Sequence, residues 1–368
     1  MQLEFKTSRS TITSLLLIAP FFLWGTAMVA MKGVIPHTTP LFMAGVRLVP
    51  AGILILIAAA FMGRKQPQGL LAWLWITLFA IVDGTLFQGF LAEGLVRTSA
   101  GLGSVMIDSQ PLAVALLSWW LFQEHIGLWG WIGLALGVIG ISLIGIPDEI
   151  IVNIVNFSNS ETLLTTKGWE QLLTDIFTGG EWLMLLAALS MAVGTVMIRF
   201  VCRYADPVVA TGWHCIIAGL PLWLMSYVWE TQQWQNILPS NWLALSYATI
   251  FGSAIAYGLF FYFAQSGNLT SLSSLTFLTP IFALIFGHIF LTEVLTNIQW
   301  LGVIITLISI YLINQRENLL RKNNQATIND QSVPENVLGK PTLLQNTSTN
   351  QISKITVNMA QSQSNIKP

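Results

Sequence analysis

Long apolar stretches separated by short polar breaks run through most of the chain. An α-helix rises about 1.5 Å per residue, so about 20 apolar residues cross the hydrocarbon core of a bilayer. Stretches of this length predict ten membrane-spanning helices, at residues 12–31, 40–62, 70–95, 100–122, 128–146, 181–202, 208–229, 241–263, 270–291 and 297–314. The pattern therefore predicts an all-α, polytopic membrane protein.

The pattern also repeats itself. A proline–glutamate–glycine module occurs twice, as Pro111, Glu124, Gly133 and again as Pro280, Glu293, Gly302. One offset of 169 residues superposes the two copies, because 280 − 111, 293 − 124 and 302 − 133 all equal 169. The same offset pairs further residues: Trp131 with Trp300, Trp73 with Trp242, Gly89 with Gly258 and Gly25 with Gly194. We interpret the chain as a tandem duplication with five helices in each copy.

The duplication and the composition divide the chain into five parts. The predicted parts are a cytoplasmic N-terminus (1–11), a first five-helix repeat (12–146), a non-cytoplasmic loop (147–180), a second five-helix repeat (181–314) and a cytoplasmic tail (315–368). The tail is rich in Asn, Gln, Ser and Thr and has few apolar residues to bury, so we expect it to be disordered.

Basic residues in the short loops predict the orientation, because cytoplasmic loops of membrane proteins are enriched in Lys and Arg. With the N-terminus inside, nine such residues lie at cytoplasmic ends: Lys6, Arg9, Arg64, Lys65, Arg199, Arg203, Arg316, Arg321 and Lys322. Three lie on the other side: Lys32, Arg97 and Lys167. Both termini are therefore expected in the cytoplasm.

An odd number of helices in each repeat has a topological consequence. The second copy must enter the membrane upside down, so the repeats are expected to be related by a pseudo-two-fold axis in the membrane plane. Glu124 is then expected at the cytoplasmic face and Glu293 at the opposite face. Two halves of opposite orientation suit a device that opens alternately to either side of the membrane.

Composition supports the membrane assignment. Hydrophobic residues make up 54% of the chain and charged residues only 9%, against roughly 25% charged in soluble domains. The lipid bilayer is thus the expected surroundings of most of the chain. The formal net charge of −1 and the lack of a basic stripe argue against a nucleic-acid partner.

An ordered set of short motifs resembles the EamA family of the drug/metabolite transporter superfamily. The set comprises Phe22-Leu-Trp-Gly-Thr26, Lys32, Pro40, Arg47, Thr98-Ser-Ala100, Pro111, Glu124 and Gly133. The resemblance covers about residues 12–314 and occurs in both halves. It implies a ten-helix secondary transporter, in a family whose members export amino acids, other metabolites or drugs.

The module residues suggest structural roles first. Glu124 and Glu293 come just before the last helix of each repeat, where a carboxylate accepts backbone N–H bonds; proton binding is the alternative. Pro111 and Pro280 fall about halfway along predicted helices, so we expect two symmetric bends in gating helices. Gly133 belongs to a glycine-rich face, as does Gly302 by the repeat, and such faces allow close helix packing.

Ionisable residues inside predicted helices are the best candidates for a solute or coupling site. A charge in hydrocarbon costs at least about 2.5 kcal/mol, so these residues must face the protein interior, water or each other. The first repeat carries Arg47, Asp83, Gln88, Glu93, Asp108 and Gln110. An offset of 167, which absorbs a two-residue gap, aligns Arg47 with His214.

Two interpretations of these residues remain open. In one, Asp83 or Asp108 neutralises Arg47 and locks the helices together. In the other, Arg47, Asp108 and Gln110 bind a polar or zwitterionic solute while a carboxylate or His214 titrates as a coupling site. Trp24, Tyr257 and Tyr262 are candidates for an amphipathic cavity wall, with ordinary packing as the alternative.

The function favoured by the sequence is a secondary transporter that exports small organic solutes by alternating access. Proton exchange or the solute gradient alone would drive it. A channel or membrane sensor with the same fold is the alternative, and an intramembrane enzyme is a further one, although no catalytic or metal-binding motif is recognisable. We expect no cofactor and no metal, a monomer or homodimer, and a bacterial-type plasma (inner) membrane.

Overall fold

Apolar helices joined by short connections make up the described part of the structure. This computed structural model describes residues 2–123, 126–146, 178–265, 275–276 and 278–312. No strand occurs among these residues, and their helices are rich in the apolar residues that lipid tolerates. The predicted class, an all-α polytopic membrane protein, is confirmed. Most of the predicted loop, the predicted tail and Glu124 lie outside the described residues.

Helices of the first half follow the apolar stretches closely. They are α1 (Gln2–Val34), α2 (Pro40–Phe61), α3 (Leu70–Phe79), η2 (Ala80–Leu86), α4 (Phe87–Arg97), α5 (Ala100–Ile107), α6 (Gln110–Phe122) and α7 (Leu128–Gly145). A short 3-10 turn, η1 (Ile35–His37), follows α1. The polar breaks of the sequence coincide with the turns because only there do backbone groups reach water.

The second half has the matching elements. They are α11 (Glu181–Val201), α12 (Pro207–Trp229), α13 (Pro239–Thr249), η3 (Ile250–Ile255), α14 (Ala256–Gln265), α16 (Leu278–Leu291) and a last helix at Asn297–Leu312. Across the described residues, seven continuous stretches are long and apolar enough to span a membrane. Three shorter apolar helices are Leu128–Ile144, Leu278–Leu291 and Asn297–Leu312. The number of ten spanning helices therefore stays a prediction.

A π-helical segment interrupts one spanning helix in each half. In the first half η2 separates α3 from α4, and in the second half η3 separates α13 from α14. Adding the repeat offset to Ala80–Leu86 gives 249–255, which nearly coincides with Ile250–Ile255. π-segments are rare and are often found at functional sites. Their occurrence at corresponding positions is thus a property of the repeat.

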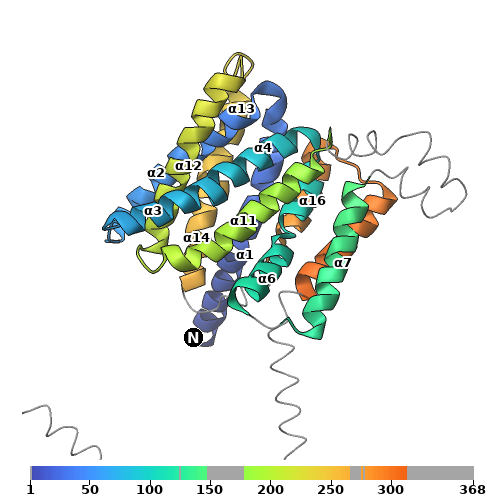
Figure 1. Cartoon of the computed structure of the whole chain (residues 1–368), viewed down its shortest axis with the longest axis horizontal. Helices are drawn as coiled ribbons and strands as arrows, with labels where there is room; N and C mark the ends of the chain where they lie inside the picture. The colour runs from blue at the N-terminus through green and yellow to red at the C-terminus, as the bar shows by residue number, and fades with distance from the viewer. Residues whose placement is uncertain (1, 124–125, 147–177, 266–274, 277, 313–368) are drawn as a thin grey trace, which may run out of the picture. The chain divides into compact units, whose positions relative to one another are not determined.

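Helices from opposite halves lie against each other throughout the bundle. Helix α2 packs along α12, α1 along α16, and α4 along α11; the α2–α12 and α4–α11 neighbours are visible in Figure 1. Gly52 on α2 and Gly212 on α12 bring these backbones together, since a Cβ on Gly52 would lie 2.6 Å from the Gly212 carbonyl oxygen. The two halves therefore share one interior.

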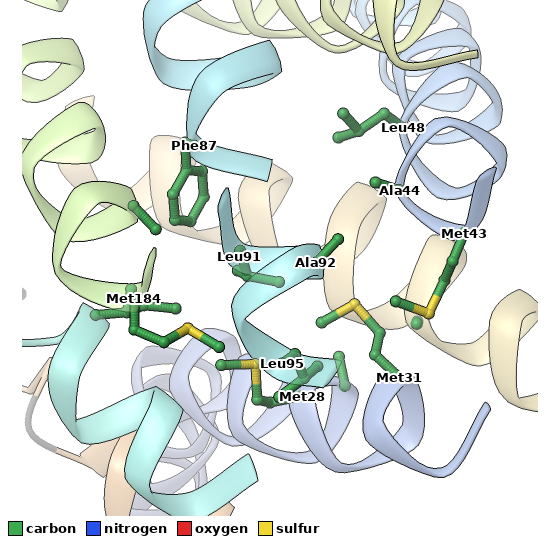
Figure 2. Close-up of a cluster of buried hydrophobic side chains, with 14 of the residues drawn as sticks. Met28, Met31, Met43, Ala44, Leu48, Phe87, Leu91, Ala92, Leu95 and Met184 are labelled. Atoms are coloured by element: carbon green, nitrogen blue, oxygen red, sulfur yellow. The ribbon is translucent and has the colours of Figure 1, made fainter. Parts of the chain in front are cut away.

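A methionine-rich apolar cluster fills part of that interior. Figure 2 shows side chains of α1, α2, α4 and α11 meeting there, among them Met28, Met43, Leu91 and Met184. Methionine side chains are flexible and polarisable, and they adapt to irregular spaces. The cluster continues into the lining of the pocket described below.

Glycines bring α7 and the last helix into backbone contact. A Cβ on Gly302 would lie 2.9 Å from the Gly140 carbonyl oxygen, and Ser309 donates a 2.5 Å hydrogen bond to the Gly133 carbonyl. This is the small-residue packing typical of membrane helices. The glycine face predicted on 128–146 therefore has the last helix as its partner.

A candidate solute site between the two halves

A pocket opens where the two halves meet. It contains about 580 Å³ of unfilled space, a measure that includes its open mouth. The first half contributes residues of α1, α2, α4 and α5, and the second half contributes residues of α11, η3, α14 and α16. Five sequence candidates line it: Trp24, Arg47, Gln88, Asp108 and Tyr257. Ligand sites of this kind are mostly apolar with a few placed polar groups.

Arg47 is the buried cation of this pocket. Its residue is only 5% exposed, and its side chain donates to the amide oxygen of Gln88 on α4. Its Nε atom has no hydrogen-bond partner among the described residues. A guanidinium has five N–H donors, so a single amide leaves much of it unsatisfied. The prediction that Asp83 or Asp108 neutralises Arg47 is not what the contacts show: its observed partner is neutral Gln88.

Asp108 lies where the fourth predicted helix breaks. Helix α5 ends at Ile107 and α6 begins at Gln110, and Asp108 between them lines the pocket. The Ser104 hydroxyl donates a 3.2 Å hydrogen bond to the Asp108 carboxylate. Pro111 follows in the first turn of α6, where a missing N–H costs least. The expected bend is thus a break in the helix, and it exposes a carboxylate to the pocket.

Aromatic rings form another wall. The Trp24 ring meets the Tyr257 ring edge-on, with centroids 5.5 Å apart, and lies 5.3 Å from the Phe260 ring. Tyr257 is also a hydrogen-bonding neighbour of Gln88. Trp24 and Tyr257 therefore combine an apolar face with polar atoms, as expected of an amphipathic wall. Tyr262 is in α14, but its side chain lies outside the described residues.

Asp83 and His214 form a separate buried pair. The Asp83 carboxylate on η2 is 3.3 Å from Nε2 of His214 on α12, and the two side chains are 15% and 4% exposed. Phe79 covers the imidazole, with ring centroids 4.4 Å apart. The Asp83 carboxylate lies against Gly194, which has no side chain to displace it. Neither member of the pair lines the pocket.

Two further candidates lie away from the pocket. Gln110, which is partly buried, donates a 2.5 Å hydrogen bond to the hydroxyl of Thr195 on α11. Glu93 is half-buried near Arg97 and Glu230. Glu93 lies in α4, ten residues beyond Asp83 of η2.

The second-half module residues differ in two respects from the prediction: Glu293 caps another helix, and Pro280 is not halfway along a helix. Glu293 does not cap the helix that follows it, where Thr296 and Gln299 form a reciprocal cap instead. Its carboxylate accepts bonds from the backbone N–H groups of Ala100 and Gly101, at 2.6 and 3.1 Å. It thus caps α5 of the other half. Pro280 lies in the first turn of α16.

Several residues that line the pocket were not among the candidates chosen from the sequence. Met28, Met31 and Met191 line the pocket, but methionine in an apolar run carries no distinguishing signal. Gly252 on η3 lines it as well, and only the repeat, which aligns it with Asp83, draws attention to it. Among the described residues there is no group of three or more His, Cys, Asp or Glu arranged to hold a metal ion.

Comparison with known proteins gives a consistent result. Residues 11–146 and 178–315 match the EamA-like transporter family. The chain is 62% identical over 319 residues to the uncharacterized transporter sll0355 of Synechocystis, covering 87% of this chain and 94% of that protein. It is 51% identical over 302 residues to the chloroplastic WAT1-related protein At3g02690 of Arabidopsis thaliana, covering 81% and 68% respectively.

More distant relatives and a solved structure are similar to most of the chain as well. The uncharacterized inner membrane transporter YedA of Escherichia coli K12 is 27% identical over 307 residues, covering 81% of this chain and 89% of YedA. One solved crystal structure has a TM-score of 0.56 at 17% sequence identity, covering 86% of this chain and 99% of that one. That likeness concerns the fold alone.

Proposed function

The chain belongs to the EamA-like transporter family, and from this premise we propose that it is a secondary transporter that exports small organic solutes by alternating access. Its relatives are named as transporters, which supports a carrier over an enzyme. The proposed substrates are amphoteric or polar molecules with an apolar body, the class that includes amino acids, other metabolites and drugs. The name of YedA supports an inner-membrane location, and the proposed topology has both termini in the cytoplasm.

The observation that carries this proposal is the make-up of the pocket. Both halves line it, and it contains buried Arg47 and the carboxylate of Asp108 within otherwise apolar and aromatic walls. Buried charges are expensive in a membrane protein, so those that face a cavity are candidate substrate contacts. A site at the junction of two repeats becomes accessible from either side when one repeat rocks against the other.

Solute counterflow in proteoliposomes tests this function. Vesicles preloaded with one unlabelled solute, from a panel of amino acids and amphiphilic cationic drugs, receive the same solute in labelled form outside. A carrier transiently accumulates the label, and the uptake rate saturates. Non-saturating flux without counterflow would instead support the channel alternative. Arg47→Gln, which keeps a polar group on α2, is expected to reduce counterflow strongly while the protein still purifies as a folded monodisperse species.

Coupling to protons is a further part of the proposal, assigned to the Asp83–His214 pair. The pair is buried between η2 and α12 and lies outside the pocket, so it can change protonation without contacting the solute. We expect Asp83→Asn to retain counterflow and to lose accumulation driven by an imposed pH gradient. Gradient-driven accumulation that survives in Asp83→Asn would remove this pair as the coupling site and leave the carrier function intact.

A further inference from the structure

Arg47 and His214 occupy corresponding positions in the two repeats, and their surroundings correspond too. The offset of 167 aligns Arg47 on α2 with His214 on α12. Helix α12 packs against η2 of the first half, and α2 packs against η3 of the second half. Each basic residue therefore lies on the second helix of its repeat, and each of these helices packs against the π-segment of the opposite repeat.

The two π-segments differ at the position that carries the carboxylate of η2. On η2 the residue that meets His214 is Asp83, at 3.3 Å. The offset of 169 aligns Asp83 with Gly252 on η3, because 83 + 169 = 252. Gly252 lines the same pocket as Arg47. His214 thus has a carboxylate from the opposite repeat, and Arg47 has a glycine at the corresponding position.

Among the described residues, no carboxylate forms an ion pair with the guanidinium of Arg47. Gln88 accepts from it, and Nε has no hydrogen-bond partner among the described residues, although the residue is only 5% exposed. A buried charge is costly unless it is paired and hydrogen-bonded. A planar guanidinium matches a carboxylate in particular, since it donates two parallel N–H bonds to the two oxygens.

We propose that a carboxylate of the transported solute pairs with Arg47 over Gly252, in the position that Asp83 occupies for His214. This subsite rests on the proposed transport function, and it makes the substrate an organic anion or zwitterion with one carboxylate. Arg47 is the only Lys or Arg among the residues that line the pocket in the described part of the chain. A single cation suits a monovalent carboxylate better than a phosphate with two charges.

The remaining walls indicate the rest of the molecule. Met28, Met31 and Leu91 are apolar, and Trp24 adds an aromatic face, so the body of the solute is apolar. Within the described part of the chain, Ser104 is the one side chain that donates to the Asp108 carboxylate, and this carboxylate in the pocket suits an amine on the same solute. A medium-sized apolar or aromatic amino acid combines all three features.

Equilibrium binding to the purified protein tests the subsite without any transport step. The probes share one phenyl body: 3-phenylpropionate and L-phenylalanine carry a carboxylate, while phenethylamine and 2-phenylethanol do not. We expect the two carboxylates to raise the melting temperature in detergent in a saturable way, phenethylamine to raise it less because it can contact Asp108 alone, and 2-phenylethanol to have little effect. Equal stabilisation by all four, or none by either carboxylate, would overturn the proposal.

A variant that supplies its own carboxylate provides the sharper test. A Cβ on Gly252 would meet the Cβ of Ala27 on α1, so the substitutions are made in an Ala27→Gly background, which gives the new side chain room as Gly194 does for Asp83. Gly252→Asp in that background should weaken L-phenylalanine binding about 10- to 100-fold, the range for losing a charge-assisted contact. Gly252→Asn has the same shape without the charge and should weaken it less.

The melting temperatures of the same two variants without ligand provide an independent test of the subsite. If an aspartate at residue 252 neutralises Arg47, Gly252→Asp should melt at a higher temperature than Gly252→Asn in the Ala27→Gly background. An aspartate variant that binds carboxylates like its background, or melts below the asparagine variant, would overturn the subsite. Carboxylate binding without counterflow would count against the transport function only, and counterflow indifferent to a carboxylate would count against the subsite only.

Discussion

The contact between Asp83 and His214 shows how a single buried residue depends on its neighbours from other helices. The carboxylate comes from η2, the imidazole from α12, and the space for the carboxylate from Gly194 on α11. Phe79 packs against the imidazole. Removing one partner of a buried pair leaves the other without compensation, which typically costs more than the pair itself contributes.

A double-mutant cycle measures that dependence. We expect Asp83→Asn and His214→Gln each to destabilise the protein, and the double variant to be more stable than the sum of the two losses. The coupling should be about 1–3 kcal/mol, as for contacting residues. Unfolding in mixed detergent–SDS micelles measures it. If the two losses simply add, the contact between Asp83 and His214 does not contribute to stability. As a control, Asp83→Asn combined with Gln299→Ala, a distant residue, should give additive losses.

The sequence predicts which residues lie in the interior better than it predicts how they pair. Arg47, Asp83 and Asp108 stand out because each interrupts an apolar stretch where a charge is expensive. Their partners depend on helix rotation and on the arrangement of the other half, which no local pattern specifies. For this reason Gln88 was recognisable as polar and buried, but not as the partner of Arg47.

At the scale of elements, charged side chains of one segment hold the ends of helices from another. Glu293 caps α5, and Glu230 accepts bonds from the Leu41 and Phe42 N–H groups of α2 at 2.8 and 3.0 Å. Lys32 donates a 2.7 Å bond to the Leu95 carbonyl near the end of α4. Each charge has the sign that the helix dipole favours at that end.

Loss of the Glu293 cap should be visible at the amides it holds. Glu293→Ala is expected to cost about 1 kcal/mol, typical of losing a side-chain cap, and to speed hydrogen exchange at Ala100 and Gly101 roughly fivefold. Glu293→Gln keeps one acceptor oxygen and should have a smaller effect. Mass-spectrometric exchange on a peptide that spans the start of α5 provides the measurement. Unchanged exchange there in Glu293→Ala would show that the contact does not stabilise α5.

Helix packing at Gly302 provides a prediction with a matched control. A Cβ on Gly302 would lie 2.9 Å from the Gly140 carbonyl oxygen, whereas a Cβ on Gly258 of α14 would meet no described residue within 4 Å. Gly302→Ala should therefore lower stability by about 1–3 kcal/mol through overpacking, and Gly258→Ala should be neutral or slightly stabilising because alanine favours helix. Melting temperatures in one detergent compare the two. Equal effects would mean that α7 and the last helix separate readily.

Elements were predictable where hydrophobicity alone decides them. The predicted stretch 40–62 is close to the observed Pro40–Phe61, since lipid requires every backbone bond to be satisfied within the helix. The π-segments were not predictable in the same way, because they shift backbone bonds by a residue at little cost in hydrophobicity, and their recurrence in both halves is what draws attention to them. The break at 108–109 did leave a mark, since Asp108 and Pro111 interrupt the apolar stretch, but the sequence indicated a bend there and not a break.

At the scale of the whole molecule, the two repeats share backbone features and differ in their buried polar side chains. The π-segments recur with the repeat, and so does a backbone detail. Gln123 and Thr292 are 169 residues apart and both have a positive φ, 55° and 54°, which residues other than glycine seldom adopt. The side chains are not repeated in the same way. Arg47 corresponds to His214 and Gly252 corresponds to Asp83, so equivalent positions carry residues of different chemistry. Symmetry is expected where the protein moves, and asymmetry where it recognises a solute.

The inverted orientation of the two copies is the prediction on which alternating access depends, and these two turn residues test it. Both are exposed, so Gln123→Cys and Thr292→Cys offer accessible thiols in a Cys202→Ser background, which removes the exposed native cysteine and leaves Cys215 buried. The predicted five helices per repeat would place the two turns on opposite faces. A membrane-impermeant maleimide added to intact cells should therefore label Thr292→Cys, and should label Gln123→Cys only after the cells are opened. Labelling of both from the same side would contradict the inverted repeat, even if each variant transports normally.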